Sequence, residues 1–188
     1  MFWLLAPVLV FIIIILLMKY YSFYSKLKVT SGTINIPWNI GTFNFEVSEQ
    51  EKIIAWKTYV QLKSRKAALP FDENYDLVEE VYNSLYELFK INRELLMLLP
   101  LDDVKRDNGM AKLQMRVLNE GVRPHLTKWQ AQFRSWWKRE LNNPDNANLT
   151  PQEIQRKFPH YDELIDDIKL LNSQLDEYSN ELLIIAKN

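Results

Sequence analysis

The chain has no cysteine, four glycines and two histidines among its 188 residues. Without cysteine it has no disulfide, no thiolate metal site and no cysteine nucleophile. The scarcity of glycine beside many long apolar and charged side chains favours a helical fold. The formal net charge of −1 gives no whole-molecule argument for nucleic acid as a partner.

The sequence also lacks the motifs of common catalytic sites. Neither His125 nor His160 has a second metal ligand at a familiar spacing, and we expect both to be capping or surface groups. No nucleophile elbow, phosphate-binding loop or dinucleotide fingerprint is present. The acidic residues in 162–167 are explained by the dipole of a helix N-terminus. We therefore expect no enzyme, no metal and no cofactor; a membrane-bound hydrolase would need carboxylates or histidines to converge in three dimensions.

Only the start of the chain holds a long apolar run. Residues 2–18 carry no charge, and a helix of that length spans roughly 25 Å. No basic residue precedes the run and bulky aromatics follow it, which is unlike a cleaved signal peptide. Residues 1–28 are therefore predicted to be a transmembrane anchor with its juxtamembrane segment. Lys19, Lys26 and Lys28 follow the run, so the positive-inside rule predicts a single-pass protein of the cell (inner) membrane, with its N-terminus outside and its body in the cytoplasm.

Residues 29–47 alternate between apolar and polar side chains. Ile34, Ile36 and Trp38 form one period-2 run, and Phe43 to Val47 form another. Two such runs around residues 39–41 predict a short β-hairpin. A lone hairpin is marginally stable in water, so we expect it to pack on helices, on the membrane surface or on a second copy.

Residues 48–188 read as an antiparallel helical bundle, and the chain as a mainly α protein. Residues 48–51 form a capping box that begins a helix to about residue 68, with Ile53, Trp56 and Val60 expected on its buried face.

Further helices are predicted over 73–99, with an apolar stripe from Val78 to Leu99, and over 107–141, where Pro124 predicts a kink or break near Arg123. Residues 150–153 resemble another helix start.

The last helix is predicted over 160–187 and has a coiled-coil pattern. Its apolar residues repeat by seven in two registers: Tyr161, Ile168, Leu175 and Leu182, then Leu164, Leu171, Tyr178 and Ile185. Such a seam packs either inside the bundle, which we favour, or against a second copy.

The stretch "LTKWQAQFRSWWKREL" (126–141) concentrates three of the six tryptophans. Leu126, Trp129, Phe133 and Trp136 fit one buried stripe, whereas Trp137 lies on its flank. An edge tryptophan beside cations is typical of a docking anchor. The candidate partner-binding residues are therefore Trp137, Arg134, Lys138, Arg139 and Lys128.

Charge is unevenly distributed along the body. Residues 105–139 hold nine basic and two acidic residues, a net of +7, between two acidic regions. Either these cations are offset by acidic neighbours within the bundle, or they form an open face for an anionic partner. No nucleic-acid module accompanies them, so nucleic acid is not the favoured partner, and no small-molecule substrate is evident.

The segments "VLNEGVRPHLTKW" (117–129) and "GTINIPWNIGTFNFEVSEQEKIIAWKTYVQL" (32–62) resemble stretches of uncharacterised bacterial membrane proteins with one anchor and a helical cytoplasmic domain. The resemblance covers about two thirds of the chain and transfers no site residue. It implies a context, because some such proteins accompany anti-phage defence genes.

These observations predict a membrane-tethered, non-enzymatic binding or regulatory subunit that acts through protein–protein contacts. We expect it to form a homo-oligomer or to have a fixed protein partner. The alternative is an oligomerising membrane effector of an anti-phage defence system, whose helical domain senses a signal.

Overall fold

A computed structural model describes residues 11–19 and 30–188. Residues 11–19 are helical, whereas the rest of the predicted anchor and juxtamembrane segment, 1–10 and 20–28, lies outside the described residues. Within the described ranges, no helix has both the length and the apolar character needed to cross a membrane. The structure therefore bears out the mainly helical body and its hairpin, and it does not support the predicted transmembrane helix.

The predicted hairpin is confirmed. Strands β1 (Thr30–Ile36) and β2 (Gly41–Val47) are antiparallel, with Thr30 opposite Val47. Trp38 and Asn39 both have positive φ in the turn, as in a type I′ hairpin turn. The inward side chains of the two strands belong to the same core as the helices: Ile34, Ile36, Phe43, Phe45 and Val47.

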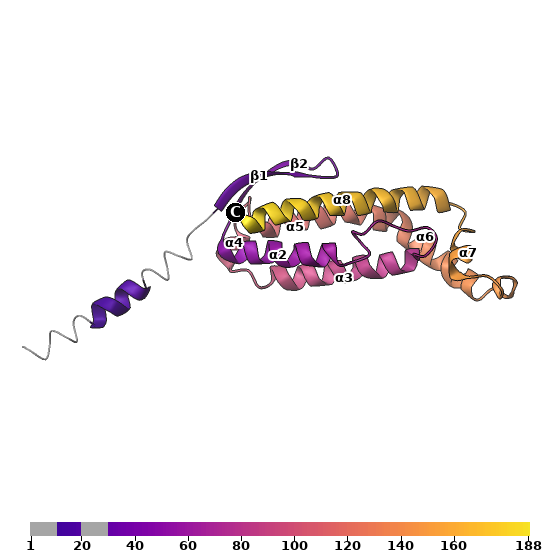
Figure 1. Cartoon of the computed structure of the whole chain (residues 1–188), viewed down its shortest axis with the longest axis horizontal. Coiled ribbons are helices and arrows are strands. Elements are labelled where there is room, and N and C mark those ends of the chain that lie inside the picture. Colours follow the sequence, from indigo (N-terminus) through magenta and orange to yellow (C-terminus); the bar gives the residue numbers. More distant parts are fainter. Residues whose placement is uncertain (1–10, 20–29) are drawn as a thin grey trace, which may run out of the picture.

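The long helices lie side by side and alternate in direction, with the hairpin along α8 (Tyr161–Lys187) (Figure 1). The start of β1, the short helix α4 (Leu101–Val104) and the C-terminus gather at one end, which we call the β1 end. Helix α7 (Pro151–Gln155) lies at the opposite end (Figure 1). The antiparallel bundle predicted from the sequence is thus present.

Helix α2 (Glu49–Lys63) begins at the predicted capping box on Ser48, but the prediction of its buried face is wrong. Ile53, Trp56 and Val60 are 40–50% exposed. The buried face instead carries Ile54, Ala55 and Leu62 together with the polar residues Glu51 and Thr58. Because these two polar side chains are hydrogen-bonded inside the bundle, apolar periodicity alone selects the wrong face.

Helix α3 (Val78–Leu96) is shorter than the predicted range 73–99. Its buried stripe is otherwise as expected, with Val78, Val81, Tyr82, Leu85 and Leu88 in the core. The chain then turns, and α4 follows Pro100.

The third helical region is irregular next to Pro124, but it is not broken as the sequence allowed. Helix α5 (Met110–Arg116) passes into a π-helical segment, η2 (Val117–Val122), and then into α6 (Arg123–Leu141). Proline has no N–H to donate to the carbonyl four residues earlier, and its ring crowds the preceding turn. The irregularity therefore takes the form of a wider turn that keeps the helix continuous.

A short 3₁₀ turn, η3 (Pro144–Asn146), and α7 connect α6 to α8, and Thr150 caps α7 with the predicted capping box. Every residue of the α8 seam is buried in the bundle, as favoured from the sequence. Ile165, Asn172 and Ser179 are buried as well, so the covered face is wider than a two-register seam.

Candidate binding surface

The tryptophans of α6 belong mainly to the core. Trp129 and Trp137 are buried, and Trp136 is half-buried. The ring of Trp137 stacks on Phe133, with 5.8 Å between the ring centroids and 16° between the planes. The expectation of Trp137 as an exposed anchor is therefore wrong: this flank of α6 is covered, and only 7% of the residue is exposed.

The cations predicted to accompany Trp137 do not converge on it. Arg134 Nε donates to Glu79 at 3.3 Å and its Nη2 donates to Asn83 at 2.9 Å, both on α3. Arg139 donates to Ser135 within α6 at 2.8 Å. The ammonium of Lys128 lies 4.3 Å from the centre of the Trp129 ring, and Lys138 is exposed. These four cations stay individual surface groups, and a partner-binding role for them remains a prediction.

Much of the basic region 105–139 is offset inside the molecule. Arg106 pairs with Glu51 and Asp103, Arg134 with Glu79, and the other pairs are local: Lys105–Asp102, Lys112–Asp107 and Arg116–Glu120. Of the two arrangements expected from the sequence, the structure favours internal compensation. Exposed pairs of this kind each contribute only about 0–1 kcal/mol.

His125 is a core residue, so its prediction as a capping or surface group is wrong. Its Nδ1 lies 2.8 Å from Asp167 Oδ2, and Trp129 Nε1 donates to the same oxygen at 2.7 Å. Burial lowers the pKa of His125, and the hydrogen bond with Asp167 opposes that effect. His160 is exposed at the start of α8, in keeping with its prediction.

The His125–Asp167 pair resembles part of a catalytic triad, but its free ring nitrogen is enclosed. His125 Nε2 is buried and has no hydrogen-bond partner among the described residues. In the described part of the chain, no group of three or more histidine or acidic side chains is placed to hold a metal ion. We therefore interpret this pair as a polar element of the core.

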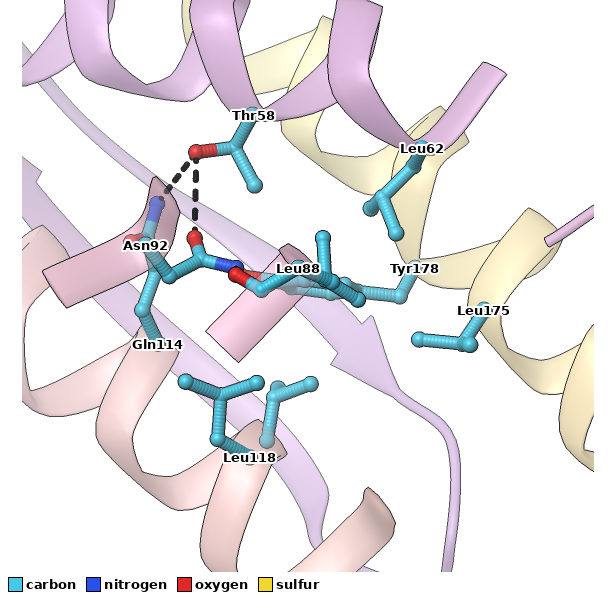
Figure 2. Close-up of a pocket in the computed structure, with 9 residues that line it drawn as sticks. Thr58, Leu62, Leu88, Asn92, Gln114, Leu118, Leu175 and Tyr178 are labelled. Atoms are coloured by element: carbon cyan, nitrogen blue, oxygen red, sulfur yellow. Dashed lines mark hydrogen bonds between the residues drawn. The ribbon is translucent and has the colours of Figure 1, made fainter. Parts of the chain in front are cut away.

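A small cavity lies between α2, α3, η2 and α8 (Figure 2). Thr58 Oγ1 accepts a hydrogen bond from Gln114 Nε2 at 2.8 Å and lies 3.5 Å from Asn92 Oδ1. Gln114 Oε1 and the Tyr178 hydroxyl also face this region, and neither has a hydrogen-bond partner in the described ranges. The cavity volume is about 10 Å³, room for no more than one water molecule, so it is not a ligand site.

The main candidate surface is a groove of about 800 Å³ between the second half of α3 and the α5–η2 segment, closed at the β1 end by α4. We call it the α3–α5 groove. Its floor includes Leu99, Ala111 and Leu118, which are 2–8% exposed. Its edge includes Met97 and Leu101, each 76% exposed. A contiguous apolar surface of this kind is typical of an interaction site.

The groove is charged at the end away from α4. Lys90 and Arg123 line it there and Arg93 lies midway along α3, against one acidic residue, Glu94. The guanidinium of Arg123 lies 5.7 Å from the centre of the Phe89 ring, which also lines the groove. Among the described residues neither Arg93 nor Arg123 has an ion-pair partner within 4.0 Å. The groove thus combines an apolar end at α4 with a basic end near Arg123.

A buried polar network fixes α4 and the start of α5, which form one end of the groove. Glu51, fully buried on α2, accepts hydrogen bonds from the backbone N–H of Ser48 at 2.9 Å and of Met110 at 2.8 Å. Arg106 donates to Glu51 and, at 2.7 Å, to Asp103. A single buried carboxylate therefore joins α2 to the loop between α4 and α5.

The same network fixes the direction of α4. Ser48 Oγ donates to Asp103 of α4 at 2.8 Å. Gly109 completes the site, because a Cβ there would come within 2.7 Å of Glu51 Oε1. Hydrogen bonds to α2 and its N-cap thus hold α4, whose apolar side chains Leu101 and Val104 are exposed.

The sequence contains one indication of this groove, which is hidden by the apolar periodicity of α3. In "LLMLLPL" (95–101), Leu95, Leu96 and Leu99 continue the buried stripe, but Met97, Leu98 and Leu101 do not. Apolar residues that lie beside a proline and outside the buried stripe mark the edge of the groove in this sequence.

No protein family, curated protein or solved structure matches this chain.

Proposed function

We propose that this chain is a membrane-tethered, non-enzymatic binding subunit that acts through protein–protein contacts at the α3–α5 groove. The observation that carries the proposal is the apolar edge of that groove, where Met97 at the end of α3 and Leu101 at the start of α4 are each 76% exposed. A soluble domain rarely exposes such side chains together unless a partner covers them.

The partner is a protein rather than a small molecule. A compound lying on the groove floor would leave the outer edge in water, since Met97 and Leu101 are 76% exposed and Leu98, outside the groove, is 57% exposed. A second macromolecule covers all three at once. Burial of such side chains contributes roughly 25 cal/mol per Å² of apolar surface removed from water.

The tether is the second part of the proposal. The uncharged run at residues 2–18 is the anchor, with the N-terminus outside and the body in the cytoplasm. Residues 20–29 separate Lys19 from β1, and ten residues reach at most about 36 Å when fully extended. The β1 end, which carries α4, is thereby held near the bilayer and near other membrane proteins, which raises its effective concentration toward them.

As the fixed partner, a different protein is favoured over a second copy of this chain. The α8 seam, the sequence feature that most suggested a second copy, is occupied within the bundle. The α3–α5 groove is not covered by the described body. The basic segment after the anchor of a second copy does not suit it, because Lys19, Lys26 and Lys28 would meet the like charges of Arg93 and Arg123.

The test is copurification of the full chain from membranes of its own cells in mild detergent. We expect a second protein in stoichiometric amount with the wild type, and its loss from the Met97→Ser/Leu101→Ser variant. The matched control is Tyr75→Ser/Leu170→Ser, which changes residues that are 78% and 55% exposed outside the groove. A partner retained by all three forms, or found with none, would overturn the proposal.

A further inference from the structure

The dimensions of the α3–α5 groove identify the shape of its occupant. Along α3 it extends from Phe89 to Met97, eight residue steps, or about 12 Å at 1.5 Å per residue. Apolar side chains at positions i, i+4 and i+7 of a helix span about 10.5 Å by the same rise. Two turns of an amphipathic helix therefore match the length of the groove, as in other helix-in-groove complexes.

The charges at the basic end identify the chemistry of the occupant. Lys90 lies 3.5 Å from Glu87, whereas Arg93 and Arg123 have no carboxylate within 4.0 Å among the described residues. Acidic side chains placed beyond the apolar anchors of a docked helix would meet these two guanidinium groups. Arginine forms paired, charge-assisted hydrogen bonds with carboxylates, which adds direction as well as attraction.

Resting on the proposed function, we infer that the α3–α5 groove binds an amphipathic helix of a partner protein. Three apolar side chains of that helix, spaced over about two turns, lie against the floor at Leu99 and Leu118 and under the edge at Met97 and Leu101. Its acidic side chains lie beside Arg93 and Arg123. The apolar contacts supply affinity, and the charges select the partner and its direction.

The experiment uses the full chain in nanodiscs of phosphatidylcholine, with two designed helical peptides. Both peptides carry leucines at i, i+4 and i+7; one carries three flanking glutamates and the other three lysines at the same positions. We expect the acidic peptide to bind at least tenfold more tightly than the basic one. The preference should shrink with added salt, because exposed charges are screened.

A charge-reversed variant separates this recognition from general stickiness. Arg93→Glu/Arg123→Glu changes two exposed residues without breaking an ion pair of the described body, and circular dichroism checks its fold. The variant should reverse the preference, so that the lysine peptide binds more tightly. Equal binding of the two peptides by the wild type, or an unchanged preference in the variant, would overturn the inference.

The bilayer is the competing occupant, and the absence of native cysteine makes it measurable. Met97→Cys can carry an environment-sensitive fluorophore at a single position. In the discs we expect the fluorophore to emit as it does in a polar environment. Its emission should shift to the blue when the acidic peptide is added. A blue shift without peptide would mean that lipid already covers this edge, and the inference would fail.

The two proposals fail in different ways. A copurified partner that is lost from the Met97→Ser/Leu101→Ser variant, together with no binding of either peptide, would leave the proposed function standing and overturn the acidic helix as its occupant. Discrimination between the peptides with no copurified partner would overturn the proposed function and leave the chemistry of the groove standing.

Discussion

The indole ring of Trp38 lies on Gly121, joining the tip of the hairpin to the π-helical segment. A Cβ atom on residue 121 would come within 2.6 Å of Trp38 Cδ2 and 2.9 Å of its neighbours. The indole also packs edge-to-face with Tyr178, with 6.5 Å between ring centroids and 62° between the planes. The missing side chain at Gly121 is therefore what lets the hairpin close over the junction of α5 and α6.

This contact predicts that the effect of Gly121→Ala on the free energy of unfolding depends on the side chain at position 38. Gly121→Ala in the wild type should lower the free energy of unfolding by about 1–3 kcal/mol, the usual cost of overpacking a core. In a Trp38→Ala background the clash is gone, and the same change should be neutral or stabilising, since alanine is favoured over glycine in a helix by up to about 1 kcal/mol. Urea unfolding of the four forms measures the coupling. An equal cost in both backgrounds would show that Trp38 is not the obstacle.

The buried carboxylate of Glu51 should be the most sensitive charged position of the body. Glu51→Ala removes the acceptor of two backbone N–H groups and leaves Arg106 with Asp103 alone. Breaking one side of a buried pair typically costs about 3–5 kcal/mol. The matched control is Glu49→Ala, whose side chain is 56% exposed on the same helix, with an expected cost below about 1 kcal/mol. Similar unfolding midpoints for the two variants would contradict this role.

His125 predicts a loss of stability in mild acid. Its folded-state pKa is lowered, mainly by burial, against the opposing effect of Asp167. As the pH falls through about 6.5, the unfolded chain takes up a proton that the folded chain resists, so stability present at pH 7.5 is lost below about pH 6.5. One proton accounts for at most about 1.4 kcal/mol per pH unit.

The comparison between pH 7.5 and 5.5 is made by urea unfolding of the wild type and two variants. His125→Asn should lose less stability on acidification than the wild type, because the titrating group is gone. His160→Asn should behave as the wild type does, since His160 is exposed at the start of α8. Parallel losses in all three proteins would assign the pH dependence to other groups.

The proposed anchor predicts a result in membrane fractionation. The full chain should stay in the pellet after alkaline carbonate extraction. Leu9→Arg/Ile13→Arg places two charges near the middle of the apolar run, each costing about 2.5–3.5 kcal/mol on the insertion scale. This variant should move to the soluble fraction, whereas Ser22→Arg, beyond the run, should not. Extraction of the wild type would contradict the tether.

Local sequence rules predicted the elements of this fold well. The hairpin, both capping boxes and the irregular turn before Pro124 depend on neighbouring residues, so they can be predicted from short stretches of sequence. The α8 seam could also be predicted, because its heptad pattern holds over the whole helix.

The errors arose where distant segments decide burial. Ile53 and Trp56 are exposed because Glu51 and Thr58 find polar partners on the inner side of α2. Trp137 is buried on the flank of α6, and His125 turns inward to an aspartate 42 residues away. Only the exposed edge of the groove leaves a sign in the sequence, at residues 95–101; its floor exists only after α3 packs beside the α5–η2 segment.

The central claim is that this chain is a subunit joined to a different protein, and the intact mass of the particle released from native membranes tests it most directly. We expect the particle to have the mass of one 22.4 kDa chain plus that of a second protein. The Met97→Ser/Leu101→Ser variant should lose this second protein. Masses at whole multiples of 22.4 kDa, with no other protein, would contradict it and point to a self-assembling membrane effector.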